Sequence, residues 1–170
     1  MLGRRRARGW PASVGEAAWY VLVVRVALSV LAVFVVAGGG VPGPCHFELA
    51  RNGWTTIPPL EAEGPAFLLV GVWQRWDACW YAKIATYGYE AGTNSVTFFP
   101  LLPALMALGG SILGSVTVAG IVVGFVASVA GLAVVHRLVA LDVGRAVASR
   151  TILYQLVFPS GFFLLAPFTE

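Results

Sequence analysis

One aspartate stands inside a dense run of aromatic residues, and this setting is the feature of the sequence that most directly suggests chemistry. Asp77 lies within the stretch Trp73-Gln-Arg-Trp-Asp-Ala-Cys-Trp-Tyr-Ala-Lys-Ile-Ala-Thr-Tyr87. An ionised carboxylate beside apolar surface is costly unless it is paired or hydrogen-bonded. A carboxylate in a partly dry pocket can act as a general base, which typically contributes roughly 100- to 10,000-fold to a rate. Asp77 is therefore the first residue of this sequence for which a functional role should be considered.

Helical periodicity places this aspartate at the edge of an aromatic face. With about 100° of rotation per residue, five residues form one stripe of the helix: Trp73, Trp76, Trp80, Ile84 and Tyr87. Asp77 lies at the edge of this stripe, and Arg75 faces away from it. A solvated position on an interfacial anchor and a constrained functional position both fit Asp77, and the aromatic edge favours the second. Lys83 and Arg75 are the cations nearest to Asp77 in the sequence, and Lys83 fits an interfacial snorkelling role. Gly88 is expected to end the helix.

Composition places the chain in a membrane. Of its 170 residues, 58% are hydrophobic and 11% are charged, and the mean hydropathy of +0.81 is far too apolar for a soluble domain of this length. The net charge of +3 comes from basic residues near the ends of hydrophobic segments, so membrane topology explains it and no nucleic-acid partner is expected. We expect an all-α polytopic membrane protein, with residues 1–170 in one membrane domain surrounded by membrane lipids.

Three runs predict transmembrane helices by their length and apolar character: residues 19–38, 116–135 and 146–167. Four arginines within residues 4–8 predict a cytoplasmic N-terminus, with a cleaved signal peptide as the alternative. Arg25 is expected to snorkel toward the cytoplasmic surface, and Pro159 to kink or unwind the third run. The second run carries a row of small residues that would let a partner helix approach, or that simply reflects glycine enrichment in membrane helices: Gly120, Gly124 and Ser128.

A fourth run, residues 98–113, decides the topology. It holds Pro100 and Pro103 in its first turns and is short for a span. If it crosses the bilayer, the basic loop at 136–150 falls outside the cell, against the positive-inside rule. We prefer a re-entrant or outer-leaflet helix, which keeps that loop cytoplasmic. This arrangement makes residues 41–96 the first extracytoplasmic segment, with interfacial helices, on the same face as Glu170.

The cysteines and histidines of the sequence give weaker indications of function than Asp77. Cys45 and Cys79 both fall in the predicted outer segment, where a disulfide is permitted, although Cys79 also fits simple packing against the aromatic helix. His46 and His136 are isolated, and we interpret them as a loop residue and a helix-end residue. The sequence has no Asp-x-Asp and no His-x-x-His arrangement, so we assign no metal and no cofactor, although two carboxylates on one face can hold a divalent ion.

Three motifs in register resemble a known family. They are Trp76-Asp77 with Trp80-Tyr81, then Phe98-Phe99-Pro100-Leu101-Leu102-Pro103, and finally Phe158-Pro159-Ser160-Gly161-Phe162-Phe163 running on to Thr169-Glu170. Over about residues 70–170, their order and spacing are similar to those of the GPI mannosyltransferase II (PIG-V) family and its bacterial relatives. These are membrane glycosyltransferases of the GT-C superfamily.

The resemblance implies transfer of a sugar, usually mannose, from a polyprenyl-phosphate donor to an acceptor hydroxyl at the extracytoplasmic face. The acidic residue of the family's first outer loop matches Asp77, and the glutamate after its kinked span matches Glu170, which could orient Asp77, bind the sugar or ligate a cation. In this transfer we assign Asp77 to catalysis as the general base. For the lipid phosphate we prefer Lys83 to Arg75, which points away from Asp77. The residues assigned to substrate binding are Lys83, Arg75, Glu170, Trp76 and Tyr81.

Members of this family continue past the glutamate with several further spans. We therefore expect these 170 residues to be the N-terminal portion of a longer enzyme, with a truncated homologue as the alternative. We expect the chain to lie in the cell membrane and to be inactive alone. The alternative from another class is a non-enzymatic membrane module, such as a partner subunit or transporter fragment, in which the face of Gly120 packs against another protein.

Overall fold

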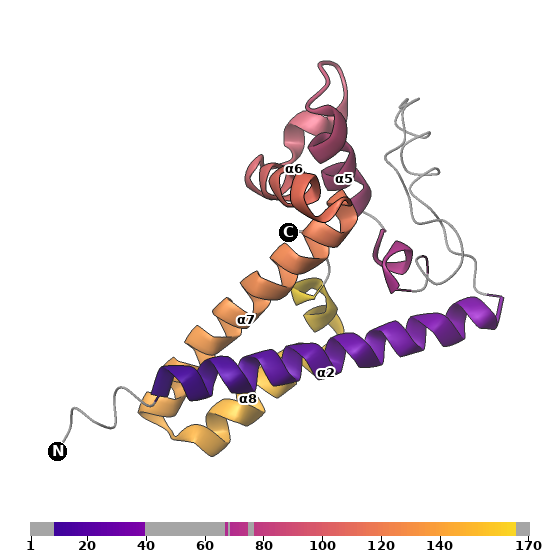
Figure 1. Ribbon diagram of the computed structural model, residues 1–170. Coiled ribbons are helices and arrows are strands. Elements are labelled where there is room, and N and C mark those ends of the chain that lie inside the picture. The colour runs from indigo at the N-terminus through magenta and orange to yellow at the C-terminus, as the bar shows by residue number, and fades with distance from the viewer. Residues whose placement is uncertain (1–8, 40–66, 68, 75–76, 166–170) are drawn as a thin grey trace. The chain divides into compact units, whose positions relative to one another are not determined.

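The computed structural model describes residues 9–39, 67, 69–74 and 77–165 of the chain. Regular structure in these residues is helical, and they contain no β-strand (Figure 1). The predicted all-α class is confirmed. The chain forms two compact units, and the helices α2 and α7 each run from one into the other; the first unit comprises Met1–Ala27 and Gly124–Leu165, the second Leu28–Val123 and Ala166–Glu170.

The first long helix, α2 (Gly9–Ala37), begins ten residues before the predicted run at 19–38. Pro11 lies in its first turn, where the missing N–H has no helical partner to lose. Glu16 does not end the helix because its carboxylate finds partners in the same unit.

The second long helix, α7 (Val116–Asp142), begins where the sequence predicted and extends seven residues beyond the predicted end. Ser115 caps it, since its Oγ accepts the N–H of Val118 at 3.3 Å. Within the described residues, α2 over Gly9–Val35 and α7 are the two helices long and apolar enough to cross a membrane.

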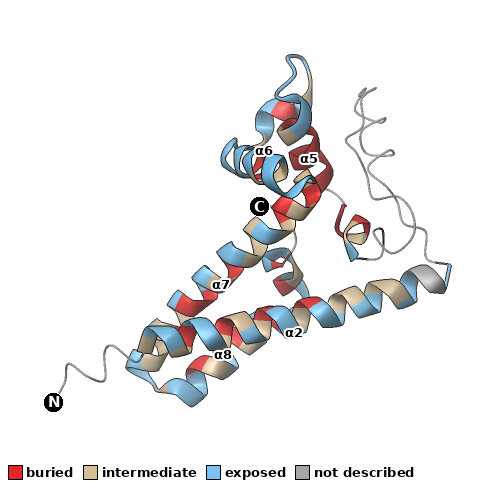
Figure 2. Cartoon of the chain, in the orientation of Figure 1, coloured by how far each residue is buried: buried red, intermediate tan, exposed pale blue. Residues whose placement is uncertain are grey.

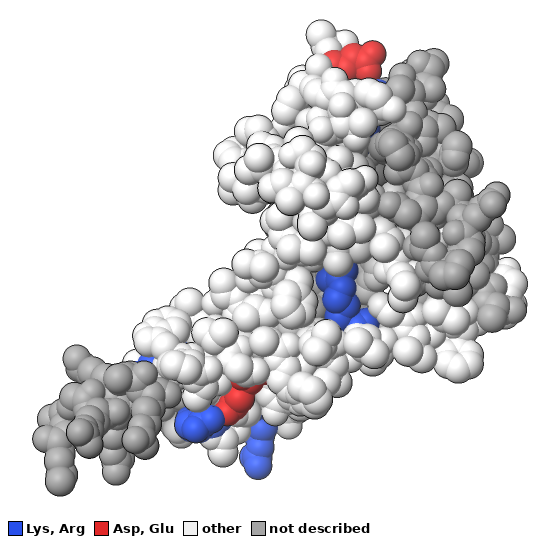
Figure 3. Space-filling model, in the orientation of Figure 1, with Lys and Arg blue, Asp and Glu red and all other residues white. Residues whose placement is uncertain are grey.

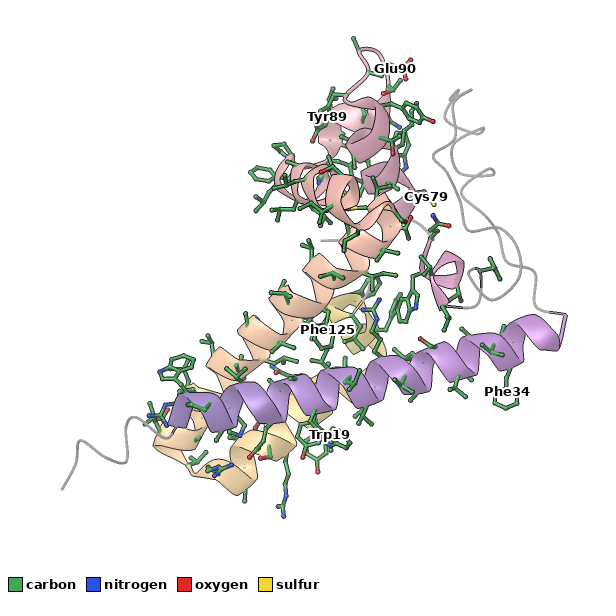
Figure 4. The ribbon with its side chains drawn as sticks, in the orientation of Figure 1. Trp19, Phe34, Cys79, Tyr89, Glu90 and Phe125 are labelled. Atoms are coloured by element: carbon green, nitrogen blue, oxygen red, sulfur yellow. The ribbon has the colours of Figure 1, made fainter. Side chains whose placement is uncertain are left out.

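The surfaces of both long helices also fit a lipid environment. The most apolar stretches of α2 and α7 are only 11% and 28% buried, whereas a core helix of a soluble protein would be mostly buried. Figure 2 shows that much of the surface of α2 is exposed or partly exposed. Trp19 and Phe34 project from this helix (Figure 4) and are both exposed. On the face shown in Figure 3, charged side chains are few.

The predicted third span at 146–167 is not one continuous helix. Helix α8 (Arg145–Val157) has 13 residues, Phe158 is extended, and a 3₁₀ helix, η3 (Pro159–Leu164), follows. Pro159 lacks the N–H that would continue α8, and its ring disfavours a helical conformation at Phe158. The interruption predicted at Pro159 is confirmed, and the described part of the chain has two candidate spans instead of three or more.

The second unit contains the short elements of the predicted outer segment, together with the fourth run. They are η1 (Gly71–Trp73), α5 (Asp77–Tyr87), η2 (Asn94–Thr97) and α6 (Leu101–Leu113). Helix α6 packs against α5, burying Leu102 and Met106. It ends at Gly114, whose φ is +78°. Its 13 residues span about 20 Å, less than the roughly 30 Å of a hydrocarbon core.

Candidate functional site

Asp77 is the first residue of α5, and its side chain is half-buried. The N–H groups of a first helical turn carry partial positive charge, which stabilises an ionised carboxylate at this position. Arg75 and Trp76, which the sequence assigns to the same site, lie outside the described residues. The described geometry thus provides a carboxylate placed to accept a proton or a hydrogen bond.

The aromatic stripe beside Asp77 packs inside its unit. Trp73, Trp80 and Ile84 are buried, and only Tyr87 among the described members of the stripe is exposed. The ring of Trp80 stacks on Phe98, with centroids 5.3 Å apart and planes at 18°. Phe98, from the loop that follows, contacts the rings of both Trp80 and Tyr81, so this part of the stripe is covered by the chain itself. The interfacial position of the helix stays a prediction.

Two residues assigned to substrate binding are enclosed in the same packing. The ring of Tyr81 is buried and meets Phe98 edge-on at 5.2 Å. Lys83 is buried to 3% exposure, and its Nζ lies 3.1 Å from the Oε2 of Glu90, which is 60% exposed. Lys83 lies six positions after Asp77 in the sequence. The two residues are therefore about 9 Å apart along the helix axis and on different faces of the helix. The structure therefore does not bring Lys83 and Asp77 together.

The loop after α5 is fixed by its own polar groups. Gly88 ends the helix as predicted, with φ at +82° and its N–H donating to the carbonyl of Ile84 at 2.8 Å. The buried Oγ of Ser95 accepts the N–H of Glu90 and donates to its carbonyl, both at 3.1 Å. Thr93 donates to the same carbonyl at 2.9 Å. These bonds fix the backbone of Glu90 (labelled in Figure 4), whose side chain pairs with Lys83.

Two ties hold the segment on either side of Asp77. The Nε2 of Gln74 donates to the Oγ1 of Thr117 at 2.6 Å, in buried surroundings. Cys79 is disulfide-bonded, and the described residues include no free cysteine. Cys45, the only other cysteine of the sequence, lies outside them. Of the two interpretations left open for Cys79, the structure supports the disulfide.

The first unit contains a second polar cluster, which we call the helix latch: Ser13, Glu16, His136, Arg145 and Ser149. The imidazole of His136 is buried, with Nδ1 2.9 Å from the Oγ of Ser13 and Nε2 2.9 Å from the Oε2 of Glu16. Arg145 and Ser149 also donate to the carboxylate of Glu16. The latch therefore joins the start of α2 to the end of α7 and the start of α8 (Figure 1).

The sequence reasoning missed this cluster. His136 was interpreted as an isolated helix-end residue, yet it lies within α7 and is 1% exposed. A local signal existed, because Ser13 and Glu16 are three residues apart and so share a helix face. Their partner His136 lies more than a hundred residues along the chain from both, a contact that periodicity does not reveal.

The predicted position of Arg25 also needs correction. Its side chain is 9% exposed, and its Nη1 donates to the carbonyl of Leu165 at 2.6 Å, so it is directed into the unit and does not snorkel. Ser128, from the row of small residues, donates to the carbonyl of Gly124 at 2.7 Å and also to that of Leu164. Ser128, one of the three small residues expected to contact a partner helix, therefore contacts another segment of the same chain. Glu170 lies outside the described residues.

Comparison with known proteins gives no match: no family model, no curated protein and no solved structure matches the chain. Among the residues that the structure describes, no group of three or more His, Cys, Asp or Glu side chains is placed to hold a metal ion.

Proposed function

We propose that this chain belongs to a membrane glycosyltransferase, similar to mannosyltransferases, that transfers a sugar from a polyprenyl-phosphate donor to an acceptor hydroxyl. The observation that carries the proposal is the placement of Asp77 at the N-terminus of α5, in the motif that resembles the family's acidic position. On either side of it in the sequence, Gln74 is held by a hydrogen bond to Thr117 and Cys79 by a disulfide. A general base benefits from such fixed surroundings.

In this reaction the acceptor oxygen attacks the anomeric carbon as the bond from that carbon to the phosphate oxygen breaks. The Asp77 carboxylate takes the proton of the acceptor hydroxyl, and the polyprenyl phosphate leaves with the bonding electron pair. A cation would stabilise the departing phosphate. We assign this role to Arg75 ahead of Lys83, because Lys83 is already paired with Glu90.

The proposed active face is extracytoplasmic. Structural disulfides persist in oxidising compartments and are rare in the cytosol, and Cys79 is disulfide-bonded two residues after Asp77. A carboxylate that shares α5 with this cysteine would therefore act on the outer side of the membrane.

We further propose a multi-pass arrangement in which the N-terminus and the turn between α7 and α8 lie on one face, the cytoplasmic one. The contact between Ser13 and His136 supports it, since it joins the start of α2 to the end of α7. Two spanning helices joined in this way run in opposite directions. The same contact argues that α2 is retained and not cleaved as a signal peptide, because its removal would leave the buried His136 without two of its partners.

Helix α6 fits an outer-leaflet or re-entrant position in this arrangement. It carries no charged residue and is too short to cross. One of its faces packs on α5, while the other exposes an apolar stripe consisting of Leu101, Leu105, Leu108 and Ile112. Close packing of Gly109 and Gly110 against the first turn of α7 would hold α6 at the level where α7 enters the membrane.

The proposal is tested by a transfer assay with radiolabelled polyprenyl-phosphate mannose, using the full-length protein in membranes. Asp77→Asn should lower the transfer rate at least roughly 100-fold, because the amide cannot accept the proton, while membrane insertion and thermal stability stay at the wild-type level. Asp142→Asn, at the exposed end of α7, is the matched control and should transfer normally. Wild-type transfer activity in Asp77→Asn would refute the role of Asp77. Absence of transfer by the wild type with mannosyl, glucosyl and arabinosyl donors would favour the non-enzymatic membrane module.

A further inference from the structure

Lys83 is a buried cation whose counter-ion reaches it from the surface. The side chain of Lys83 is 3% exposed and that of Glu90 is 60% exposed, with Nζ and Oε2 3.1 Å apart. The position that the carboxylate occupies beside the ammonium therefore borders solvent, although the ammonium itself does not. Because Lys83 lies about 9 Å along α5 from Asp77, this pair forms a site separate from the candidate base.

The two members of this pair depend on it unequally. A buried ammonium is costly unless an anion stays close to it. A carboxylate that is mostly in water keeps its hydration, so the same contact contributes little to its free energy. The ammonium of Lys83 thus requires an anion at this position, and that anion need not be Glu90.

The backbone of the loop does not depend on the carboxylate. The Oγ of Ser95 accepts the N–H of Glu90 and donates to its carbonyl, and Thr93 donates to that carbonyl as well. The hydroxyl of Tyr89 donates to the carbonyl of Phe98 at 2.8 Å, which ties the two ends of the loop together. The Glu90 side chain can therefore turn away into solvent while the fold of the loop is kept.

A phosphate group has the chemistry to take the place of this carboxylate. A phosphate monoester carries about −1.5 to −2 charges at pH 7 and three strong acceptor oxygens, whereas the carboxylate carries a single charge. A lysine ammonium has three donors and binds phosphate as a point charge. Exchange of the carboxylate for a phosphate would therefore increase the electrostatic attraction at Lys83.

We propose that Lys83 is a binding site for a phosphate group, and that the carboxylate of Glu90 is an internal ligand which the phosphate displaces. The Glu90 carboxylate then keeps the ammonium paired while the site holds no phosphate. The phosphate comes either from a lipid headgroup or from a free phosphate compound, since both present the same oxygens. The proposal concerns binding alone and does not rest on the transferase function.

Thermal unfolding of the intact protein in phosphatidylcholine nanodiscs tests this site, because a ligand that binds the folded state raises the unfolding midpoint. One probe is inorganic phosphate, added at constant ionic strength. The other probe is phosphatidic acid, mixed into the nanodisc lipid. Glu90→Gln removes the competing charge and should bind at least one probe roughly 2- to 5-fold more tightly than the wild type does. Adding Lys83→Met should abolish that gain.

A matched control separates this competition from the general loss of a negative charge. Asp142 is exposed and lies in the first unit, so Asp142→Asn should leave the affinity for both probes at the wild-type level. A gain in Glu90→Gln with inorganic phosphate would assign the site to free phosphate, and a gain with phosphatidic acid alone would assign it to a lipid headgroup.

Three results would overturn the site. They are wild-type affinity of Glu90→Gln for both probes, a gain that persists after Lys83→Met is added, and an equal gain in Asp142→Asn. If the variant with Lys83→Met does not fold, the comparison of Glu90→Gln with the wild type and with Asp142→Asn still decides.

Discussion

Glu16 of α2 and His136 of α7 lie 2.9 Å apart, from carboxylate oxygen to imidazole Nε2, in a protein whose long helices are almost entirely apolar. The imidazole is 1% exposed and the carboxylate 28% exposed, so solvent does little to satisfy His136. Its second nitrogen meets Ser13. Since the imidazole has a partner at each nitrogen, the loss of either one should be felt in stability.

We predict that Glu16→Gln and His136→Gln each lower the free energy of unfolding by roughly 1–2 kcal/mol. The double variant should lose clearly less than the sum of the two, because both changes break the same contact. Thermal unfolding in detergent, followed by size-exclusion chromatography, measures these losses. Arg150→Gln, on the exposed side of α8, controls for the loss of a charge at this end of the unit. Losses that simply add would show that Glu16 and His136 act independently.

The tight packing of η3 on α8 gives a second prediction. A Cβ at Gly161 would collide with the carbonyl oxygens of Gln155 and Leu156, which are backbone atoms and cannot turn away. Gly161→Ala should therefore lower stability by roughly 1–3 kcal/mol in the same unfolding assay. Gly131 in α7 has nothing within 4 Å of its Cβ position, so Gly131→Ala should be neutral or stabilising. Equal behaviour of the two variants would contradict this packing.

The ion pair at the end of α5 makes a third prediction. Glu90→Gln leaves the buried ammonium of Lys83 with a weaker acceptor and should lower stability by about 1 kcal/mol, since Glu90 itself is 60% exposed. Adding Lys83→Met removes the buried charge and should recover most of that loss. Thermal unfolding of the single and double variants checks both steps. A double variant less stable than Glu90→Gln would mean that the Lys83 ammonium has a further stabilising role.

Local signals in the sequence were sufficient for the ends of several elements. Gly88 ends α5 and Pro159 interrupts the third run as expected, because a positive φ and a missing N–H act on the residue itself and its immediate neighbours. The all-α class followed from composition in the same way. Features that depend only on nearby residues were thus predictable from the sequence.

Features that depend on distant partners were not predictable in this way. Snorkelling was a reasonable expectation for Arg25, but the carbonyl of Leu165 lies 140 residues further along the chain and takes up its side chain. Phe98 packs against the rings of Trp80 and Tyr81, a contact that the helical spacing of these residues did not indicate. Periodicity identifies a helix face and does not identify what packs against it.

The topology makes the last prediction. If α7 crosses the membrane with the latch on the cytoplasmic side, single cysteines at Ala91 and at Val143 should react with a membrane-impermeant maleimide from opposite sides. Ala91 is exposed next to Gly92, whose φ of +82° would strain a cysteine, and Val143 is 62% exposed in the turn after α7. In intact cells the Ala91→Cys protein should label and the Val143→Cys protein should label only after permeabilisation. Labelling of both from outside would mean that residues 98–113 cross the bilayer and would overturn the arrangement.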